Sequence, residues 1–167
     1  KEKIDFTPKI ALILGSGLGD YAEQADIKAV LDYKDIEGFP VSTAPGHKGR
    51  FVFGYVGGVP VVIMQGRVHY YEGYSMEDVV LPTRLMKSAE VLFLTNAAGG
   101  VNWQFECGDF MLINDQICMA PSPLIGENPD ELGPRFPDMS EIYSKELREV
   151  IRHTARDLDI RLREGVY

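Results

Sequence analysis

The sequence has few of the residues from which disulfide frameworks, zinc sites and membrane spans are built. Its two cysteines are too few for a disulfide framework, and it shows neither a charged and then apolar leader nor a run of about 18 apolar residues. The three histidines form no HExxH motif and no close pair with zinc spacing. These absences predict a cytoplasmic protein that binds no metal and has no membrane partner.

Basic residues are also fewer than acidic residues. The 167 residues carry a formal net charge of −8. A negative net charge of this size repels nucleic acids and acidic membrane surfaces. Nucleic acid is therefore not an expected partner, although a small anion in a local donor-rich pocket is compatible with the charge. With 45% hydrophobic residues and no internal repeat or low-complexity tract, the chain is expected to form a single domain over residues 1–167.

Short apolar runs alternate with helix-like segments, which predicts an α/β fold with a central mixed β-sheet flanked by helices. Strands are expected at residues 10–14, 29–33, 51–56, 59–64, 91–95 and 110–117. Those at 10–14 and 91–95 have the apolar composition of buried strands, and Gly57-Gly58 predicts a hairpin.

Helices are expected at residues 18–25, at 76–89 behind a Ser75 cap, and around 147–158. Pro82 should kink or split the second of these helices. Residues 120–139 contain five prolines and predict a long loop, of a kind that compact domains usually retain for function.

The segment QGRVHYYEGY at residues 65–74 combines cationic donors with tyrosines. If the preceding strand continues, period-two alternation places Arg67, His69 and Tyr71 on one face. A guanidinium offers forked donors that match phosphate, an imidazole adds another donor, and the Tyr71 ring could cover a sugar. The alternative that the residues leave open is an ion pair between Arg67 and Glu72 at the end of a sheet.

Three further segments have both a functional and a purely structural interpretation. In GSGLG, Asp20 stands where a dinucleotide fingerprint needs its third glycine, so the segment is either a tight turn or a site where Ser16 and backbone amides bind one phosphate. His47 lies in the basic segment PGHKGR and is either a surface residue or close to an anion. TNAAGG at 95–100 follows a strand with small residues, as a turn or as a close approach to a ligand.

Taken in order, GSGLG, GHKGR, MQGRVHYYEGY and TNAAGGVN resemble the trimeric purine nucleoside phosphorylases, a family that includes the methylthioadenosine phosphorylases. GFPVSTAPGHKG, GDFMLINDQI and RFPDMSEIY extend the resemblance over nearly the whole chain from about residue 10. The resemblance implies phosphorolysis of purine ribonucleosides or deoxyribonucleosides to free base and (deoxy)ribose 1-phosphate. It also implies inorganic phosphate as co-substrate, no cofactor and a homotrimer.

The same resemblance assigns roles to individual residues. Its phosphate donors are Ser16, Arg67, His69 and the backbone amide of Ala97, with His47 near the same anion; Arg67 and His69 are the expected catalytic residues. Its substrate contacts are Tyr71 over the ribose, Asn96, Ala98 and Gly99 at the base, and Phe136 at the ribose site of a neighbouring subunit.

The resemblance places the residues that stabilise the departing purine beyond Tyr167. The sequence therefore leaves open a preference for 6-oxopurines or 6-aminopurines, a methylthioadenosine phosphorylase, and a non-catalytic fragment that binds phosphate or a nucleoside. LREGVY at the end predicts a strand entering a sheet, so we expect the functional protein to be longer than this chain.

Overall fold

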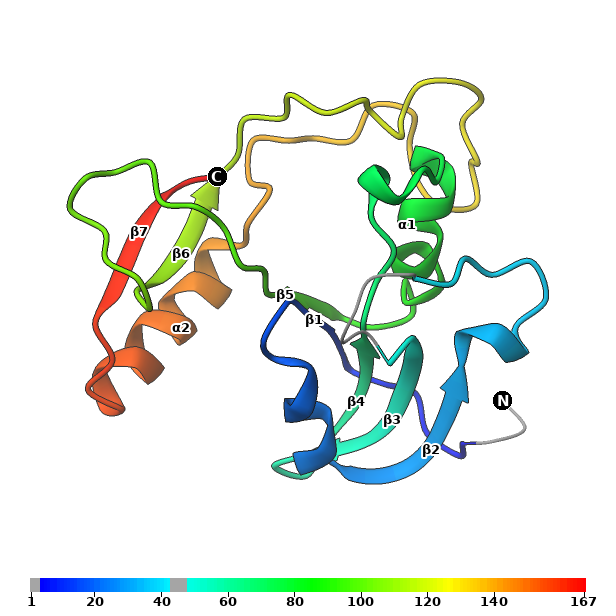
Figure 1. Ribbon diagram of the computed structural model, residues 1–167, viewed down its shortest axis with the longest axis horizontal. Coiled ribbons are helices and arrows are strands. Elements are labelled where there is room, and N and C mark those ends of the chain that lie inside the picture. Colours follow the sequence, from blue (N-terminus) through cyan, green and yellow to red (C-terminus); the bar gives the residue numbers. More distant parts are fainter. Residues whose placement is uncertain (1–3, 43–47) are drawn as a thin grey trace. The chain divides into compact units, whose positions relative to one another are not determined.

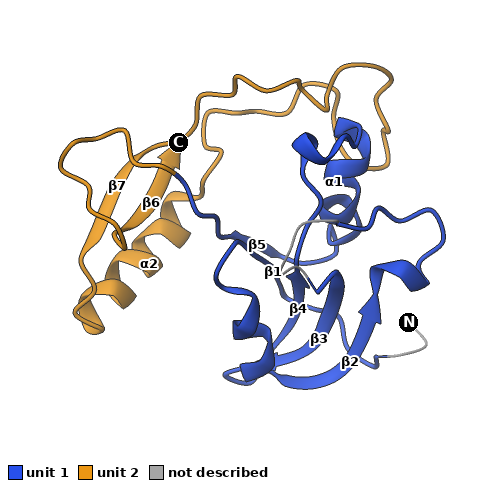
Figure 2. Cartoon of the chain, viewed as in Figure 1, with its two compact units in different colours: residues 1–98 blue, residues 99–167 orange. Residues whose placement is uncertain are grey.

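The computed structural model describes residues 4–42 and 48–167, and the chain divides into two compact units. Unit 1 comprises Lys1–Ala98 and unit 2 comprises Gly99–Tyr167 (Figure 2). Each unit contains its own β-sheet (Figure 1). A single domain spanning the whole chain stays a prediction.

Unit 1 is built on a five-stranded sheet with the order β2-β3-β4-β1-β5. Its strands are β1 (Ile10–Leu14), β2 (Asp26–Asp32), β3 (Arg50–Val56), β4 (Val59–Gln65) and β5 (Val91–Leu94). Strand β3 is antiparallel to β2 and β4, whereas β1 is parallel to β4 and β5. The predicted α/β fold with a mixed sheet is therefore confirmed.

The β3–β4 hairpin forms as its glycine pair predicted. Gly57 and Gly58 have φ values of 57° and 80°, the left-handed backbone that a two-residue hairpin turn requires. Strand β2 begins three residues earlier than expected, and its register with β3 shifts between Ile27 and Ala29. Gly54 lies opposite this irregularity, where a Cβ atom would come within 2.3 Å of the Asp26 carbonyl oxygen.

The helices of unit 1 differ from expectation in length and type. The segment after β1 forms the 3₁₀ helix η1 (Gly19–Gln24), and shorter 3₁₀ helices are η2 (Tyr33–Asp35) and η3 (Tyr70–Glu72). Helix α1 (Met76–Leu85) starts as predicted, with Ser75 Oγ accepting a hydrogen bond from the Asp78 amide at 3.1 Å. Helix α1 is not split at Pro82, because it continues past this buried residue before ending at Leu85; the alternative, a kink at Pro82, stays a prediction.

Hydrophobic side chains cover both faces of the central strands. Val62 and Met64 of β4 belong to one cluster with Tyr33, while Val61 and Ile63 belong to a second cluster. This two-sided burial explains why β4 is a continuous apolar run. Strand β5 is the exception: Leu92, Phe93 and Leu94 are exposed, because within the described residues β5 is an edge strand that pairs with β1.

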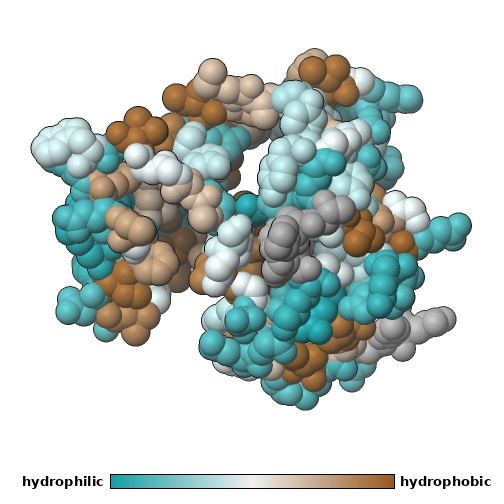
Figure 3. Space-filling view, viewed as in Figure 1, coloured by the Kyte–Doolittle hydropathy of each residue, from teal (hydrophilic) through white to brown (hydrophobic). Residues whose placement is uncertain are grey.

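Unit 2 contains a parallel pair of strands, β6 (Phe110–Asp115) and β7 (Leu162–Val166), and helix α2 (Lys145–Asp157) between them in sequence. The expected strand at the end of the sequence is thus confirmed as β7. Residues 116–144 contain neither helix nor strand, which confirms the predicted long loop. Hydrophobic residues lie exposed on the surface (Figure 3), and those of unit 2 include Val101, Trp103, Met119 and Phe136.

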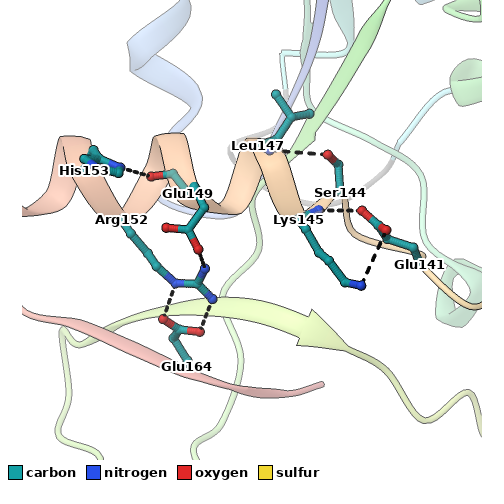
Figure 4. A network of polar contacts seen from close by, with 8 residues as sticks. All are labelled: Glu141, Ser144, Lys145, Leu147, Glu149, Arg152, His153 and Glu164. Atoms are coloured by element: carbon teal, nitrogen blue, oxygen red, sulfur yellow. Dashed lines mark hydrogen bonds and ion pairs between the residues drawn. The ribbon is translucent and has the colours of Figure 1, made fainter.

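Polar contacts fix α2 against β7. Ser144 Oγ accepts a hydrogen bond from the Leu147 amide at 3.3 Å and so caps α2. Arg152 of α2 donates to both carboxylate oxygens of Glu164 in β7, each at 2.6 Å, and also pairs with Glu149 (Figure 4). This forked ion pair lowers the pKa of Glu164, mainly through the hydrogen bond from Arg152.

Candidate functional site

The candidate site lies at the edge of the unit 1 sheet where β1, β4 and β5 end. These three strands are parallel neighbours, so the residues that follow them meet at one edge: Gly15 and Ser16, Arg67, and Thr95 to Ala97. Carboxyl ends of parallel strands are the usual location of ligand sites in α/β sheets. The mixed sheet thereby brings together three of the sequence motifs.

Thr95 fixes the loop after β5 against the loop after β1. Its Oγ1 accepts a hydrogen bond from the Gly15 amide at 2.8 Å, and its own amide and hydroxyl donate to the Ile13 carbonyl at 3.0 and 3.1 Å. A Cβ atom on Gly15 would lie 2.5 Å from the Thr95 carbonyl oxygen. Glycine at position 15 therefore allows the two loops to approach closely.

Ser16 lies exposed within the turn that this contact holds. The turn is closed by a hydrogen bond from the Leu18 amide to the Gly15 carbonyl at 3.1 Å, and Gly17 has a φ of 86°. Glycine adopts this left-handed backbone conformation without steric penalty. GSGLG is therefore a tight turn that carries a hydroxyl at a strand end.

Arg67 does not continue strand β4. The strand ends at Gln65, and Gly66 turns the chain with a φ of 95°, so the predicted alternation of Arg67, His69 and Tyr71 along one strand face is wrong. Arg67 nevertheless reaches the site, because its Nη1 donates to the Thr95 carbonyl at 3.4 Å. The buried hydroxyl of Tyr33 donates to the Gly66 carbonyl at 2.7 Å and fixes the residue before Arg67.

His69 is oriented by the buried carboxylate of Glu72. Glu72 Oε1 accepts from the His69 backbone amide at 2.8 Å and lies 2.9 Å from His69 Nδ1. Ser42 Oγ donates to the same carboxylate at 3.3 and 3.2 Å. Because a carboxylate only accepts, this contact holds the proton on Nδ1 and sets the orientation of the imidazole.

Tyr71 packs on His69 from the 3₁₀ helix η3. The two rings are stacked, with centroids 4.9 Å apart and planes inclined by 20°. The tyrosine is 76% exposed, so most of its ring is accessible to solvent. The turn after Gly66, rather than strand alternation, brings these two side chains together.

Lys48 and Arg50 of the basic segment contact Glu23 of η1. Glu23 Oε1 accepts from Lys48 Nζ at 2.7 Å and from Arg50 Nη2 at 2.6 Å. The hydrogen bond from Lys48, followed by that from Gln65, lowers the pKa of Glu23. His47, the other expected anion contact of this segment, lies outside the described residues.

The remaining predicted residues lie near the boundary of the two units or beyond it. Asn96, Ala97 and Ala98 are exposed at the end of unit 1, and Gly99 begins unit 2. Phe136 belongs to the long loop of unit 2 and is 87% exposed. The ligand roles of the predicted site residues stay predictions.

Four residues that organise the site carry no ligand role in the sequence-based assignment: Tyr33, Gln65, Glu72 and Thr95. The sequence offers Glu72 as a partner for Arg67, and the structure places its carboxylate against His69. Thr95 lies within the TNAAGG motif. Gln65 begins the QGRVHYYEGY motif, but the motif gives no indication of its partner Gly19, which lies 46 residues away. Tyr33 lies outside these motifs, and its partner Gly66 is 33 residues away.

Residues 4–42 and 48–167 contain no group of three or more His, Cys, Asp or Glu side chains that could hold a metal ion. In that same part of the chain, no helix has the length and apolar character needed to cross a membrane.

Comparison with known proteins assigns the family. The model of the phosphorylase superfamily matches residues 9–167, and the chain belongs to this family. It is 54% identical to purine nucleoside phosphorylase 1 of Geobacillus stearothermophilus, and the alignment covers 100% of this chain and 62% of that protein. Purine nucleoside phosphorylase 1 of Bacillus subtilis is 51% identical, with 100% and 63% covered.

A solved structure shows the same fold. Isoform 2 of purine nucleoside phosphorylase from Schistosoma mansoni, in complex with cytosine and ribose-1-phosphate, superimposes with a TM-score of 0.89 at 42% identity. That alignment covers 100% of this chain and 61% of the other. The chain thus spans about three fifths of the length of the relatives that it matches.

Proposed function

We propose that the protein is a purine nucleoside phosphorylase, which converts a purine ribonucleoside or deoxyribonucleoside and phosphate into free base and (deoxy)ribose 1-phosphate. The observation that carries this proposal is the meeting of the Ser16 turn, Arg67 and the Thr95–Ala97 loop at one sheet edge. The relatives named above support it, since a chain 54% identical over the full length of this sequence is a purine nucleoside phosphorylase.

Phosphate is the ligand that suits the chemistry of this edge. Ser16 contributes a hydroxyl and the adjoining turn contributes backbone amides, which together favour a small anion. Arg67 supplies a guanidinium and His69 an imidazole that Glu72 orients. We assign phosphate binding to Ser16, Arg67, His69 and the Ala97 amide, with His47 beside the same anion.

The bound phosphate then performs the chemistry. Its oxygen attacks C1′ of the nucleoside, the C1′–N9 bond breaks, and the purine leaves with the bonding electron pair and takes up a proton. Because the ribosyl centre becomes cationic as this bond breaks, a fixed phosphate dianion acts both as nucleophile and as electrostatic stabiliser. Arg67 and His69 are catalytic in this proposal because they hold the attacking phosphate.

We assign the substrate contacts as the family resemblance implies. Tyr71, with most of its ring exposed, covers the ribose, and the small residues Ala98 and Gly99, with Asn96, lie along the base. Phe136 is assigned to the ribose site of a neighbouring subunit, so the proposal includes a homotrimer. Phosphate is a co-substrate, and the reaction as written needs no further cofactor.

Arg67→Ala tests this assignment. Loss of a charged hydrogen-bond donor, worth about 1.5 to 3 kcal/mol, should raise the KM for phosphate about 10- to 150-fold. The assay follows inosine cleavage with and without phosphate and identifies ribose 1-phosphate among the products. Arg156→Ala, at an exposed arginine in the last turn of α2, is the matched control and should leave the phosphate dependence unchanged.

Two results would oppose the proposal. Cleavage of inosine at the same rate without phosphate would indicate a hydrolase. An unchanged phosphate saturation curve for Arg67→Ala would show that Arg67 does not bind phosphate.

A further inference from the structure

Gln65 is a buried polar residue at the end of β4. It is 1% exposed, and its carboxamide is hydrogen-bonded at both ends. Nε2 donates to the Gly19 carbonyl at 2.7 Å, and Oε1 accepts from Arg50 Nε at 2.7 Å. A buried amide is costly unless it is satisfied, so these two bonds fix the position of the side chain.

The bond to Gly19 holds the far end of the Ser16 turn. Gly19 is the first residue of η1 and directly follows Leu18, whose amide closes the turn onto the Gly15 carbonyl. The near end of the turn is held separately, by the bond between the Gly15 amide and Thr95. The Ser16 turn is therefore attached to its surroundings on both sides.

The same residue belongs to the strand that leads to Arg67. The backbone of Gln65 pairs with Leu14 of β1 and with Arg50 of β3, and Arg67 follows two residues later. Glu23, which lies 3.4 Å from Gln65 Nε2, joins the network with Arg50. One side chain thus connects the Ser16 turn to the strand end that carries Arg67.

We propose that Gln65 is a positioning residue whose carboxamide sets the separation of the Ser16 turn from Arg67, and with it the shape of the phosphate pocket. This inference rests on the proposed function. Glutamine suits the position because it combines one acceptor with a donor, whereas a glutamate would place a carboxylate against the Gly19 carbonyl and Glu23. Methionine would fill a similar volume with neither group.

Gln65→Met tests the proposal in kinetics. Misplacement of the turn should lower kcat/KM for phosphate by about tenfold, while kcat/KM for inosine at saturating phosphate stays within about twofold. An effect confined to phosphate distinguishes a role in positioning phosphate from a general loss of structure, which would affect both substrates. Gln24→Met, at an exposed glutamine of η1, is the matched control and should change neither constant.

Amide hydrogen exchange provides a second measurement. Exchange at Leu18 and Tyr21, whose amides bond within the turn and η1, should be faster in Gln65→Met than in the parent. If Gln65→Met does not fold, Gln65→Glu takes its place, since it retains the acceptor for Arg50 and loses the donor to Gly19. The same two changes are expected in that variant.

Defined results would overturn the inference. One is an unchanged kcat/KM for phosphate in a folded variant. Another is a loss of kcat/KM for inosine equal to the loss of kcat/KM for phosphate. A third is an unchanged rate of amide exchange at Leu18. A parent protein without phosphate-dependent cleavage would instead refute the proposed function, and exchange at Leu18 would then decide by itself whether Gln65 orders the turn.

Discussion

Tyr33→Phe removes one hydroxyl from the core of unit 1 and leaves the aromatic ring in place. The tyrosine is 1% exposed, and its hydroxyl donates to the carbonyl of Gly66, the residue before Arg67. Its ring packs on Phe39 and Phe51 with centroid separations of 4.8 and 4.9 Å, contacts that phenylalanine retains. The substitution therefore isolates the hydrogen bond from the packing.

The expected loss of stability is about 1 to 2 kcal/mol. A typical intramolecular hydrogen bond contributes about 1 kcal/mol, and a buried carbonyl left without its donor adds a desolvation penalty. Gly66 is buried, so water cannot readily replace the lost donor. With a urea m-value of about 2 kcal/mol per M, the unfolding midpoint should fall by about 0.5 to 1 M.

The Tyr33 hydroxyl should also make the free energy of unfolding depend on pH in the alkaline range. Burial raises the pKa of Tyr33 above its ordinary value of roughly 10. Above that pH the unfolded chain loses a proton that the folded protein retains, so this group lowers the stability of the parent by up to about 1.4 kcal/mol per pH unit. Tyr33→Phe lacks the effect, and its stability deficit should therefore shrink above about pH 10 and stay constant below about pH 9.

Urea unfolding monitored by circular dichroism, across this pH range, measures both effects. Tyr21→Phe removes a tyrosine hydroxyl from η1, where the side chain is exposed, and should leave the midpoint within experimental error. A Tyr33→Phe midpoint equal to that of the parent would show that the bond to Gly66 contributes no net stability. A deficit that grew above pH 10 would refute the assignment of the alkaline effect to Tyr33.

Three further substitutions test other contacts of unit 1. Gly15→Ala should destabilise the protein by about 2 kcal/mol or more, because its Cβ would lie 2.5 Å from the Thr95 carbonyl oxygen; an unchanged urea midpoint would contradict this close approach. Glu72→Gln keeps an acceptor for the His69 amide but loses the charge, so it should cost about 1 to 2 kcal/mol and raise the KM for phosphate; steady-state kinetics and unfolding check both effects. Ser75→Ala should cost about 1 kcal/mol through loss of the α1 cap, and native-state exchange in the first turn of α1 should show the loss; protection equal to the parent would contradict the role of the cap.

Several features of unit 1 follow from residues that are neighbours in sequence. The apolar run at 10–14 forms β1, Gly57-Gly58 forms the hairpin turn, and Ser75 caps α1 through the amide three residues later. In each case either the interaction is local or the residues themselves have the required conformational preference. For these features the sequence pattern was a sufficient guide.

Predictions that extrapolated a local pattern were less successful. Strand alternation through residues 67–71 predicts one shared face, but β4 ends at Gln65 and Gly66 adopts a left-handed conformation. The apolar composition of β5 indicated burial, but its position at the sheet edge leaves Leu92 to Leu94 exposed. Neither the turn nor the strand order is specified by the periodicity of the segment itself.

The sequence by itself determined the mixed α/β architecture, most of the strands, and the presence of the hydrogen-bond donors Ser16, Arg67 and His69. Only the tertiary structure decided how these donors are held, because the responsible bonds join distant residues. The Gly15 amide meets Thr95 across 80 positions, and Gln65 meets Gly19 across 46. A local pattern reports the preferences of adjacent residues, whereas these contacts exist only once parallel strands have placed their ends at one edge of the sheet.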